Sequence, residues 1–200
     1  MSPNQSRDRE AAGATSALVS LEEYLNTAYE PDRDFVDGVL LERNVGTQRH
    51  GLLQTFLILF FGQYLKSHRI ALFTETRLRV DAARGRHRIP DVMIVEVPYS
   101  KGKVVVDVPA VIIEIKSPDD TFDDIVDRCF DYEKLTVANI VIMDPDNQRA
   151  WLFQQGNIQL LTGATIQLKV SGQVIDFPFS QLFAELDEAN ELPPTSVPTH

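Results

Sequence analysis

Two apolar stretches, Pro90-Asp91-Val92-Met93-Ile94-Val95 and Ala110-Val111-Ile112-Ile113-Glu114-Ile115-Lys116-Ser117-Pro118, predict the middle of a β-sheet. Both are rich in β-branched residues and bounded by proline or charged residues, as buried strands are. Side chains alternate between the faces of a strand, so we expect Glu114 and Lys116 on one face. Asp91 opens the first stretch and joins them if the two strands are neighbours. Burying these charges at the end of an apolar sheet is costly unless a cation and hydrogen bonds compensate them, which indicates a functional site.

The flanking segments predict the rest of an α/β (α+β) fold, in which helices flank a mixed sheet. Apolar residues within 48–66 recur with the three-and-four spacing of a helix that buries one broad face. Ser20 and the Asp119-Asp120-Thr121 run supply capping chemistry for two more helices, and residues 179–186 predict a short closing helix. The Asp37-Gly38 pair marks a tight turn. Further strands are expected at residues 34–36, 39–42, 71–80, 139–145, 149–153 and 157–161, with a basic loop at residues 81–88.

The composition is that of one domain, since the 200 residues are 44% hydrophobic and 24% charged, enough for a substantial core. We expect the domain at residues 17–188, between flexible polar tails at residues 1–16 and 189–200. The single cysteine excludes an intramolecular disulfide and a cysteine-based zinc cluster. The N-terminus lacks the apolar core of a signal peptide, and the most apolar run, residues 56–61, is too short to span a bilayer. A cytoplasmic protein without a membrane partner is therefore expected.

Asp91, Glu114 and the backbone carbonyl of Ile115 are the predicted ligands of a hard divalent cation, Mg²⁺ with Mn²⁺ as the alternative. Such a cation prefers oxygen ligands and keeps several waters, so two carboxylates and one carbonyl suffice. It lowers the pKa of a bound water and stabilises charge on a phosphate. Lys116 is expected to orient the attacking water, or to deprotonate it if the lysine pKa is depressed. The pattern predicts phosphodiester hydrolysis, and a structural ion pair between Glu114 and Lys116 is the alternative.

Asp91 and the Glu114-Ile115-Lys116 run, 23 residues further on, resemble the two motifs of the PD-(D/E)XK nuclease superfamily. Over residues 18–186 the chain resembles the Uma-two family of restriction-endonuclease-like proteins. The matching features are, in chain order, Leu21 to Leu25, Asp37-Gly38, His50, Pro90-Asp91, Glu114-Ile115-Lys116-Ser117-Pro118, Arg128, Tyr132 and Asp144-Pro145. The resemblance implies a restriction-endonuclease-like fold and a DNA substrate.

The resemblance also implies accessory roles for Asp34, His50, Arg128 and Tyr132. Asp34 stands where the family usually has glutamate, so it either reaches a metal or only forms structural hydrogen bonds. His50 either contributes to a metal site, caps its helix or forms a hydrogen bond in the core. Arg128 stands where lysine is common; it contacts phosphate without acting as a base, or it is an ordinary solvated helix residue. Tyr132 is either part of the site or a core residue whose hydroxyl has a partner.

These features together predict a metal-dependent DNA endonuclease. The alternative is a catalytically silent module that keeps the fold and binds nucleic acid or assembles with other subunits. The net charge of −10 favours the alternative, because such a surface does not attract DNA over long distances. A local basic groove, or a dimer that frames the duplex, overcomes this repulsion. We expect a homo-oligomer, such as a dimer, because paired nuclease sites suit the two strands of a duplex.

Overall fold

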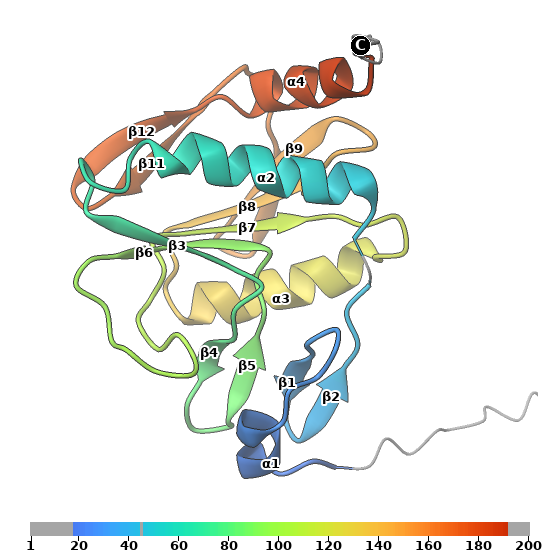
Figure 1. The fold of residues 1–200 in the computed structure, drawn as a ribbon, viewed down its shortest axis with the longest axis vertical. Coiled ribbons are helices and arrows are strands. Elements are labelled where there is room, and N and C mark those ends of the chain that lie inside the picture. Colours follow the sequence, from blue (N-terminus) through green and yellow to red (C-terminus); the bar gives the residue numbers. More distant parts are fainter. Residues whose placement is uncertain (1–17, 45, 192–200) are drawn as a thin grey trace, which may run out of the picture.

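The computed structural model describes residues 18–44 and 46–191, and its centre is a six-stranded mixed sheet (Figure 1). The strand order is β10-β9-β8-β7-β6-β3, in which β7 (Val111–Ile115) and β8 (Asn139–Asp144) are parallel and the other neighbours are antiparallel. The other strands of the sheet are β3 (Ile70–Thr74), β6 (Val92–Glu96), β9 (Arg149–Gln154) and β10 (Asn157–Leu160). The predicted mixed sheet with flanking helices is confirmed.

The strands β6 and β7 are antiparallel neighbours, so the two stretches that the sequence singles out lie side by side. Their register pairs Val92 with Ile113 and Ile94 with Val111. One further step in this register places Asp91 opposite Glu114, at the end of the ladder. Helix α3 (Phe122–Lys134) then connects β7 to its parallel neighbour β8, as parallel strands require a crossover.

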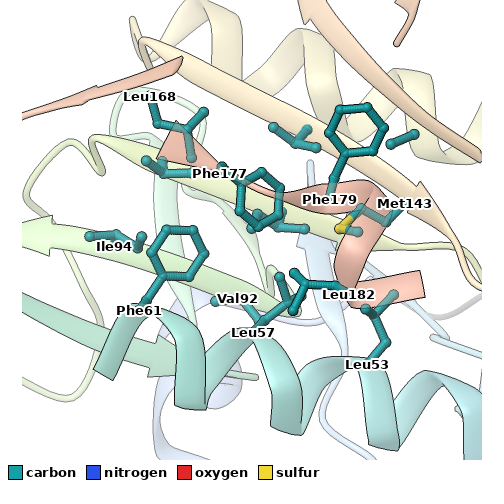
Figure 2. Packing of buried hydrophobic residues seen from close by; sticks show 14 of the residues in the cluster. Leu53, Leu57, Phe61, Val92, Ile94, Met143, Leu168, Phe177, Phe179 and Leu182 are labelled. Atoms are coloured by element: carbon teal, nitrogen blue, oxygen red, sulfur yellow. The ribbon is translucent and has the colours of Figure 1, made fainter. Parts of the chain in front are cut away.

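Helices cover both faces of the sheet and divide the core into two layers. α2 (Gln48–Gly62) and α4 (Phe179–Glu191) lie over one face, and α3 lies over the other (Figure 1). Leu53, Leu57 and Phe61 of α2 are fully buried and point toward the sheet (Figure 2). Burying each such side chain contributes about 1.5–3 kcal/mol. The predicted buried face is therefore confirmed, although the helix ends at Gly62 and not at residue 66.

The α3 layer contains the other buried apolar cluster. Its members from the sheet include Met93 and Ile112, which alternate with residues of the α2 layer along β6 and β7. Ile125, Cys129 and Tyr132 of α3 pack against them, all fully buried. Because β7 is buried on both faces, a charged residue within it must find partners inside the protein.

Side-chain caps begin the helices where the sequence predicted them. The Ser20 hydroxyl accepts a hydrogen bond from the Glu23 backbone N–H (3.1 Å), which starts α1 (Leu21–Asn26). Thr121 accepts from the Asp124 N–H at the start of α3 (3.2 Å). These bonds satisfy backbone donors that the first helical turn leaves free.

A small four-stranded sheet, of order β2-β1-β5-β4, lies beside α1 and at one end of the central sheet (Figure 1). β1 (Asp34–Val36) and β2 (Val39–Leu41) form the predicted hairpin around Asp37 and Gly38. Both turn residues have positive φ, +52° and +88°, as a tight hairpin turn requires. The hairpin leads the chain from this sheet toward α2.

Two predictions around the small sheet are wrong. Residues 71–80 are not one strand, because the chain breaks at Glu75, whose φ is +46°. β3 stays in the central sheet, whereas β4 (Leu78–Asp81) joins the small one. Residues 81–88 are not all loop, since the chain turns at Gly85 and continues as β5 (Arg86–Arg88). The arginines of β5 are paired with carboxylates of other elements, which compensates their burial.

A hairpin near the C-terminus was not predicted. β11 (Ile166–Val170) and β12 (Gln173–Phe177) pair in antiparallel register and pack against the α2 layer. The turn residues Ser171 and Gly172 both have positive φ. α4 follows and continues to Glu191, five residues beyond the predicted end.

The predicted tail at residues 1–16 and the last residues of the chain, 192–200, lie outside the described residues. Within residues 18–44 and 46–191, no helix is both long and apolar enough to cross a membrane.

Candidate functional site

A cavity of about 800 Å³ opens where the central sheet, the small sheet and the starts of α2 and α3 meet. Asp91 and Ile115 from the ends of β6 and β7 line it. The carboxyl end of a sheet at a crossover is a usual place for a functional site, because loops leave there and the core ends. Nine acidic residues and three arginines line the cavity: Asp32, Asp34, Glu42, Glu75, Asp91, Asp119, Asp120, Asp124, Asp127, Arg43, Arg88 and Arg128.

Asp91 is 3% exposed and both of its carboxylate oxygens have partners. Oδ2 accepts a hydrogen bond from the Ile115 backbone N–H at 2.7 Å, which ties the end of β6 to the end of β7. Oδ1 accepts from the Arg43 guanidinium at 2.6 Å. The backbone carbonyl of Asp91 accepts from the Gln54 side chain of α2 (2.9 Å), so Asp91 is held from three elements.

Glu114 is fully buried on the α3 side of β7, where two residues of α3 hold it. The Tyr132 hydroxyl donates to Oε1 (2.6 Å), and Arg128 Nε donates to Oε2 (3.0 Å). Arg128 and Tyr132 lie four residues apart and thus one turn apart on the same side of α3. The structure therefore places both accessory α3 residues on the carboxylate that the motif singled out.

Burial perturbs the proton affinity of this cluster. It raises the pKa of Glu114 from its ordinary value near 4.5 to about 7, an effect that Arg128 opposes and the charge of Asp91 increases. Burial and the Glu114 carboxylate raise the pKa of Tyr132 well above its usual range, so the phenol stays a neutral donor. Asp91 acts on Glu114 in this way because the register of β6 and β7 sets the two residues opposite each other. Buried acids with such shifts are typical of functional sites.

Lys116 does not join the two carboxylates. Its ammonium donates to the carbonyl of Ser117 (3.1 Å), and its backbone N–H donates to the Met143 carbonyl (2.8 Å). Among the described residues that line the cavity, Ile115 and Ser117 are present and Lys116 is not. The predicted position of Lys116 beside both carboxylates thus differs from its place in the structure.

His50 lies between two strand ends near the start of α2. Its Nδ1 is 3.2 Å from the Ser117 hydroxyl, and its Nε2 is 3.6 Å from Asp91 Oδ1. Thr47 caps the helix by accepting from the His50 backbone N–H at 3.3 Å. His50 therefore lies at the cavity, and it is Thr47, not the His50 side chain, that provides the cap.

Asp34 is part of a charge network under the cavity. One oxygen accepts from the Ile89 backbone N–H (2.9 Å) and the other from Arg88 (3.0 Å). Arg88 also contacts Asp131 of α3 at 2.8 Å, which joins the small sheet to the α3 layer. Asp34 lines the cavity, but in this structure its carboxylate is a partner of Arg88.

A sequence model with the description "Uma2: Putative restriction endonuclease" matches residues 21–175. The chain belongs to the Uma2 family. The family resemblance predicted from the motifs is therefore confirmed, and Asp91, Glu114, His50, Arg128 and Tyr132 all lie within the matched region. A comparison with curated proteins found no match.

Solved structures extend the Uma2 assignment to the fold. The chain is similar to the crystal structure of "a putative nuclease belonging to DUF820 from Anabaena variabilis ATCC 29413", with a TM-score of 0.70 and 18% identity. The match covers 84% of this chain and 99% of the other. A match to the cryoEM structure of a DrdV–DNA complex has a TM-score of 0.36 and 18% identity, and covers 71% of this chain and 12% of that one. The first comparison confirms the nuclease-like fold.

Arg43 contacts Asp91 and lines the cavity, and it was not predicted from the sequence. It follows β2 in a connection without periodicity, and its partner Asp91 lies 48 residues further along the chain. Burial alone would lower the pKa of Arg43, but Asp91 and Glu114 beside it raise that pKa above its ordinary value, so the guanidinium stays charged. Its place between the Asp-Gly hairpin and the His50 helix was the available signal.

The donor chemistry at the sheet end fits a hard divalent cation. Asp91 and Glu114 provide oxygen donors from adjacent strands, and Asp91 already pairs with a positive charge, the Arg43 guanidinium. In residues 18–44 and 46–191, no three His, Cys, Asp or Glu side chains converge as a metal cluster. Both side chains carry the oxygen donors that such a cation prefers; Asp91 lines the cavity, whereas Glu114 is fully buried and is not among the residues that line it.

Proposed function

We propose that this Uma2 protein is a metal-dependent endonuclease that hydrolyses phosphodiester bonds of DNA. One observation carries the proposal: two buried carboxylates from adjacent strands, Asp91 and Glu114, are each paired with an arginine at the end of the sheet, and Asp91 lines the polar cavity that opens there. Such a pair is expensive to bury and contributes nothing to an apolar core. Membership of a family described as "Putative restriction endonuclease" supports a catalytic role for this pair.

In the proposed reaction, Asp91, Glu114 and the backbone carbonyl of Ile115 would hold Mg²⁺ or Mn²⁺, which would supply a more acidic water and positive charge for the phosphate. The chain supplies the orientation: the Ile115 N–H fixes one oxygen of Asp91, and Tyr132 and Arg128 fix both oxygens of Glu114. Fixed ligands lose little entropy when the reacting groups assemble.

The contact of Lys116 with Ser117 gives this lysine an indirect part in the proposal. Its ammonium, bound to the Ser117 carbonyl, contributes positive charge near the sheet end and orients the Ser117 backbone. The Ser117 hydroxyl in turn contacts His50. Lys116 reaches the water only after it leaves this carbonyl, so its substitution should weaken the reaction less than substitution of Asp91.

A silent binding or assembly module is the second candidate. It is favoured by the acidic lining of the cavity, in which nine carboxylates face three guanidiniums and repel a DNA backbone. Divalent cations reduce this repulsion, so the nuclease proposal requires that DNA binding depends on them. A dimer, which we propose for cleavage of both strands, would also add surface outside the cavity.

The test is cleavage of supercoiled and linear DNA by the purified full chain with Mg²⁺ or Mn²⁺, with EDTA as the metal-free reference. We expect metal-dependent cleavage that Asp91→Asn abolishes and Lys116→Ala reduces. Asp176→Asn and Lys169→Ala are matched controls, because both residues are exposed on the C-terminal hairpin, and they should cut like the wild type. Size-exclusion chromatography with light scattering checks the dimer. An inert wild type, or equal cutting by Asp91→Asn, rejects the nuclease and leaves the binding module.

A further inference from the structure

Each buried carboxylate at the sheet end already has a guanidinium of its own. Arg43 Nη2 lies 2.6 Å from Asp91 Oδ1, and Arg128 Nε lies 3.0 Å from Glu114 Oε2. With both acids ionised, the charges of these residues cancel. A divalent cation added to this neutral group brings uncompensated positive charge beside two almost fully buried carboxylates, which is unfavourable unless another charge moves.

The three guanidiniums at the cavity differ in how firmly the protein holds them. Arg88 contacts two carboxylates, Asp34 and Asp131, from different elements. Arg128 projects from the middle of α3, next to the fully buried Cys129. Arg43 instead lies in the connection between β2 and α2, outside regular secondary structure. Arg43 is therefore the guanidinium that leaves its carboxylate at the lowest cost.

The Arg43 contact also uses the oxygen that a cation needs. Asp91 Oδ2 is occupied by the Ile115 N–H, a bond that holds two strand ends together. Oδ1 contacts Arg43 and lies 3.6 Å from His50 Nε2, and both of these residues line the cavity together with Asp91. A guanidinium and a divalent cation that contact the same carboxylate oxygen repel each other strongly. The two compete for Oδ1.

We propose that Arg43 is an exchangeable counter-ion that neutralises Asp91 in the metal-free protein and leaves when a divalent cation binds. The released guanidinium faces the cavity, where it binds an oxygen of the substrate phosphate, for which its planar donors are suited. The phosphate charge offsets the positive charge that the cation adds. The cation and a phosphodiester therefore favour each other's binding, and Arg43 is a substrate-positioning residue. The choice of a phosphodiester as ligand rests on the proposed function.

Isothermal titration calorimetry with Mn²⁺ tests the competition, because it reads metal binding without any cleavage. The full-length wild type is compared with Arg43→Gln, Asp91→Asn and the control Arg33→Gln. Arg33 pairs with Glu42, an exposed carboxylate of the cavity lining, so its loss changes the net charge equally and frees a carboxylate without touching Asp91. Breaking a charge-assisted bond is worth about tenfold to a hundredfold in an equilibrium constant, so Arg43→Gln should bind Mn²⁺ more tightly than wild type by that factor.

In the control, Arg33→Gln should stay within about twofold of wild type, as screened surface charges act weakly. Asp91→Asn should lose Mn²⁺ binding. Equal or weaker binding by Arg43→Gln, or an equal gain in Arg33→Gln, overturns the exchange.

A second titration adds dimethyl phosphate, a phosphodiester monoanion, and needs no variant for its main result. Saturating dimethyl phosphate should increase the Mn²⁺ affinity of the wild type by several-fold, and the increase should vanish in Arg43→Gln. Absence of coupling in the wild type overturns the phosphate role, even if the variant does not fold. If the protein shows both the tighter Mn²⁺ binding of Arg43→Gln and the phosphate coupling but does not cleave DNA, only the proposed function is rejected. If it cleaves DNA without these two binding effects, only the role of Arg43 is rejected.

Discussion

Tyr132→Phe probes the buried carboxylate at the centre of the site with the loss of one oxygen atom. In the wild type the Tyr132 hydroxyl donates to Glu114 Oε1 at 2.6 Å, and both side chains are fully buried. Water cannot replace the lost donor without opening the α3 layer. A hydrogen bond to a charged acceptor contributes about 1.5–3 kcal/mol, so the free energy of unfolding should fall by that amount while Glu114 is ionised.

Tyr24→Phe is the matched control. The Tyr24 hydroxyl donates to the uncharged backbone carbonyl of Arg33 at 2.9 Å, and Tyr24 is also fully buried. A neutral hydrogen bond is worth about 0.5–1.5 kcal/mol, so the control should cost about half as much. Urea unfolding followed by circular dichroism, in EDTA, measures both variants at pH 8.5.

The pH dependence separates the two variants further. Burial raises the pKa of Glu114 to about 7, so this carboxyl is ionised at pH 8.5 and protonated at pH 5.5. The cost of Tyr132→Phe should therefore fall at pH 5.5 toward about 1 kcal/mol, whereas that of Tyr24→Phe should stay constant. The idea that Tyr132 holds a charged Glu114 would be refuted if Tyr132→Phe lowered the free energy of unfolding by the same amount as Tyr24→Phe at pH 8.5. It would also be refuted if the loss in Tyr132→Phe did not change with pH.

Three further predictions concern titration, burial and charge. Because the pKa of Glu114 is higher in the folded than in the unfolded chain, the native state binds the extra proton between pH 4.5 and 7. Stability relative to Glu114→Gln should therefore fall by up to about 3 kcal/mol as the pH rises through this range, measured by urea unfolding. Burial raises the pKa of the Cys129 thiol, so iodoacetamide at pH 8 should modify it only in urea-unfolded protein, and native labelling at the same rate would contradict its burial. Asp127→Asn removes a carboxylate from the cavity lining and should raise DNA affinity about twofold in a filter-binding assay at low salt. Asp123 is exposed on the same helix but outside the lining, so Asp123→Asn should leave DNA affinity unchanged. Equal gains in both variants would show that DNA binds elsewhere.

The central strands and the motif were predictable because their signals are local. A few consecutive residues suffice to predict each of these features: the β-branched runs of β6 and β7, and the Asp37-Gly38 turn. The strand β5 was missed because Arg86 and Arg88 have the composition of a solvated loop. Their partners, Asp37, Asp34 and Asp131, lie more than 40 residues away in the chain, and the pairing exists only in three dimensions.

Site geometry was less predictable than site composition. The sequence indicated that Asp91 and Glu114 share one end of the sheet, and the register of β6 and β7 agrees. The contact of Arg43 with Asp91 could not be predicted, since a connection without periodicity does not specify which residue a side chain contacts. The expected place of Lys116 assumed that strand alternation continues past Ile115. β7 ends at Ile115, so Lys116 lies just beyond the strand, and its ammonium donates to the Ser117 carbonyl.

The pairing of β6 with β7 also protects the site against errors in folding. A slip of one residue would turn Glu114 into the aliphatic layer beneath α2 and Ile115 toward Arg128, leaving a carboxylate among hydrocarbon and a guanidinium without a partner. Mispaired sheets are thus penalised twice, by the packing and by the charges. Conversely, a substitution of Val92 or Ile113 that relaxes this pairing would disable the site without altering any residue in it.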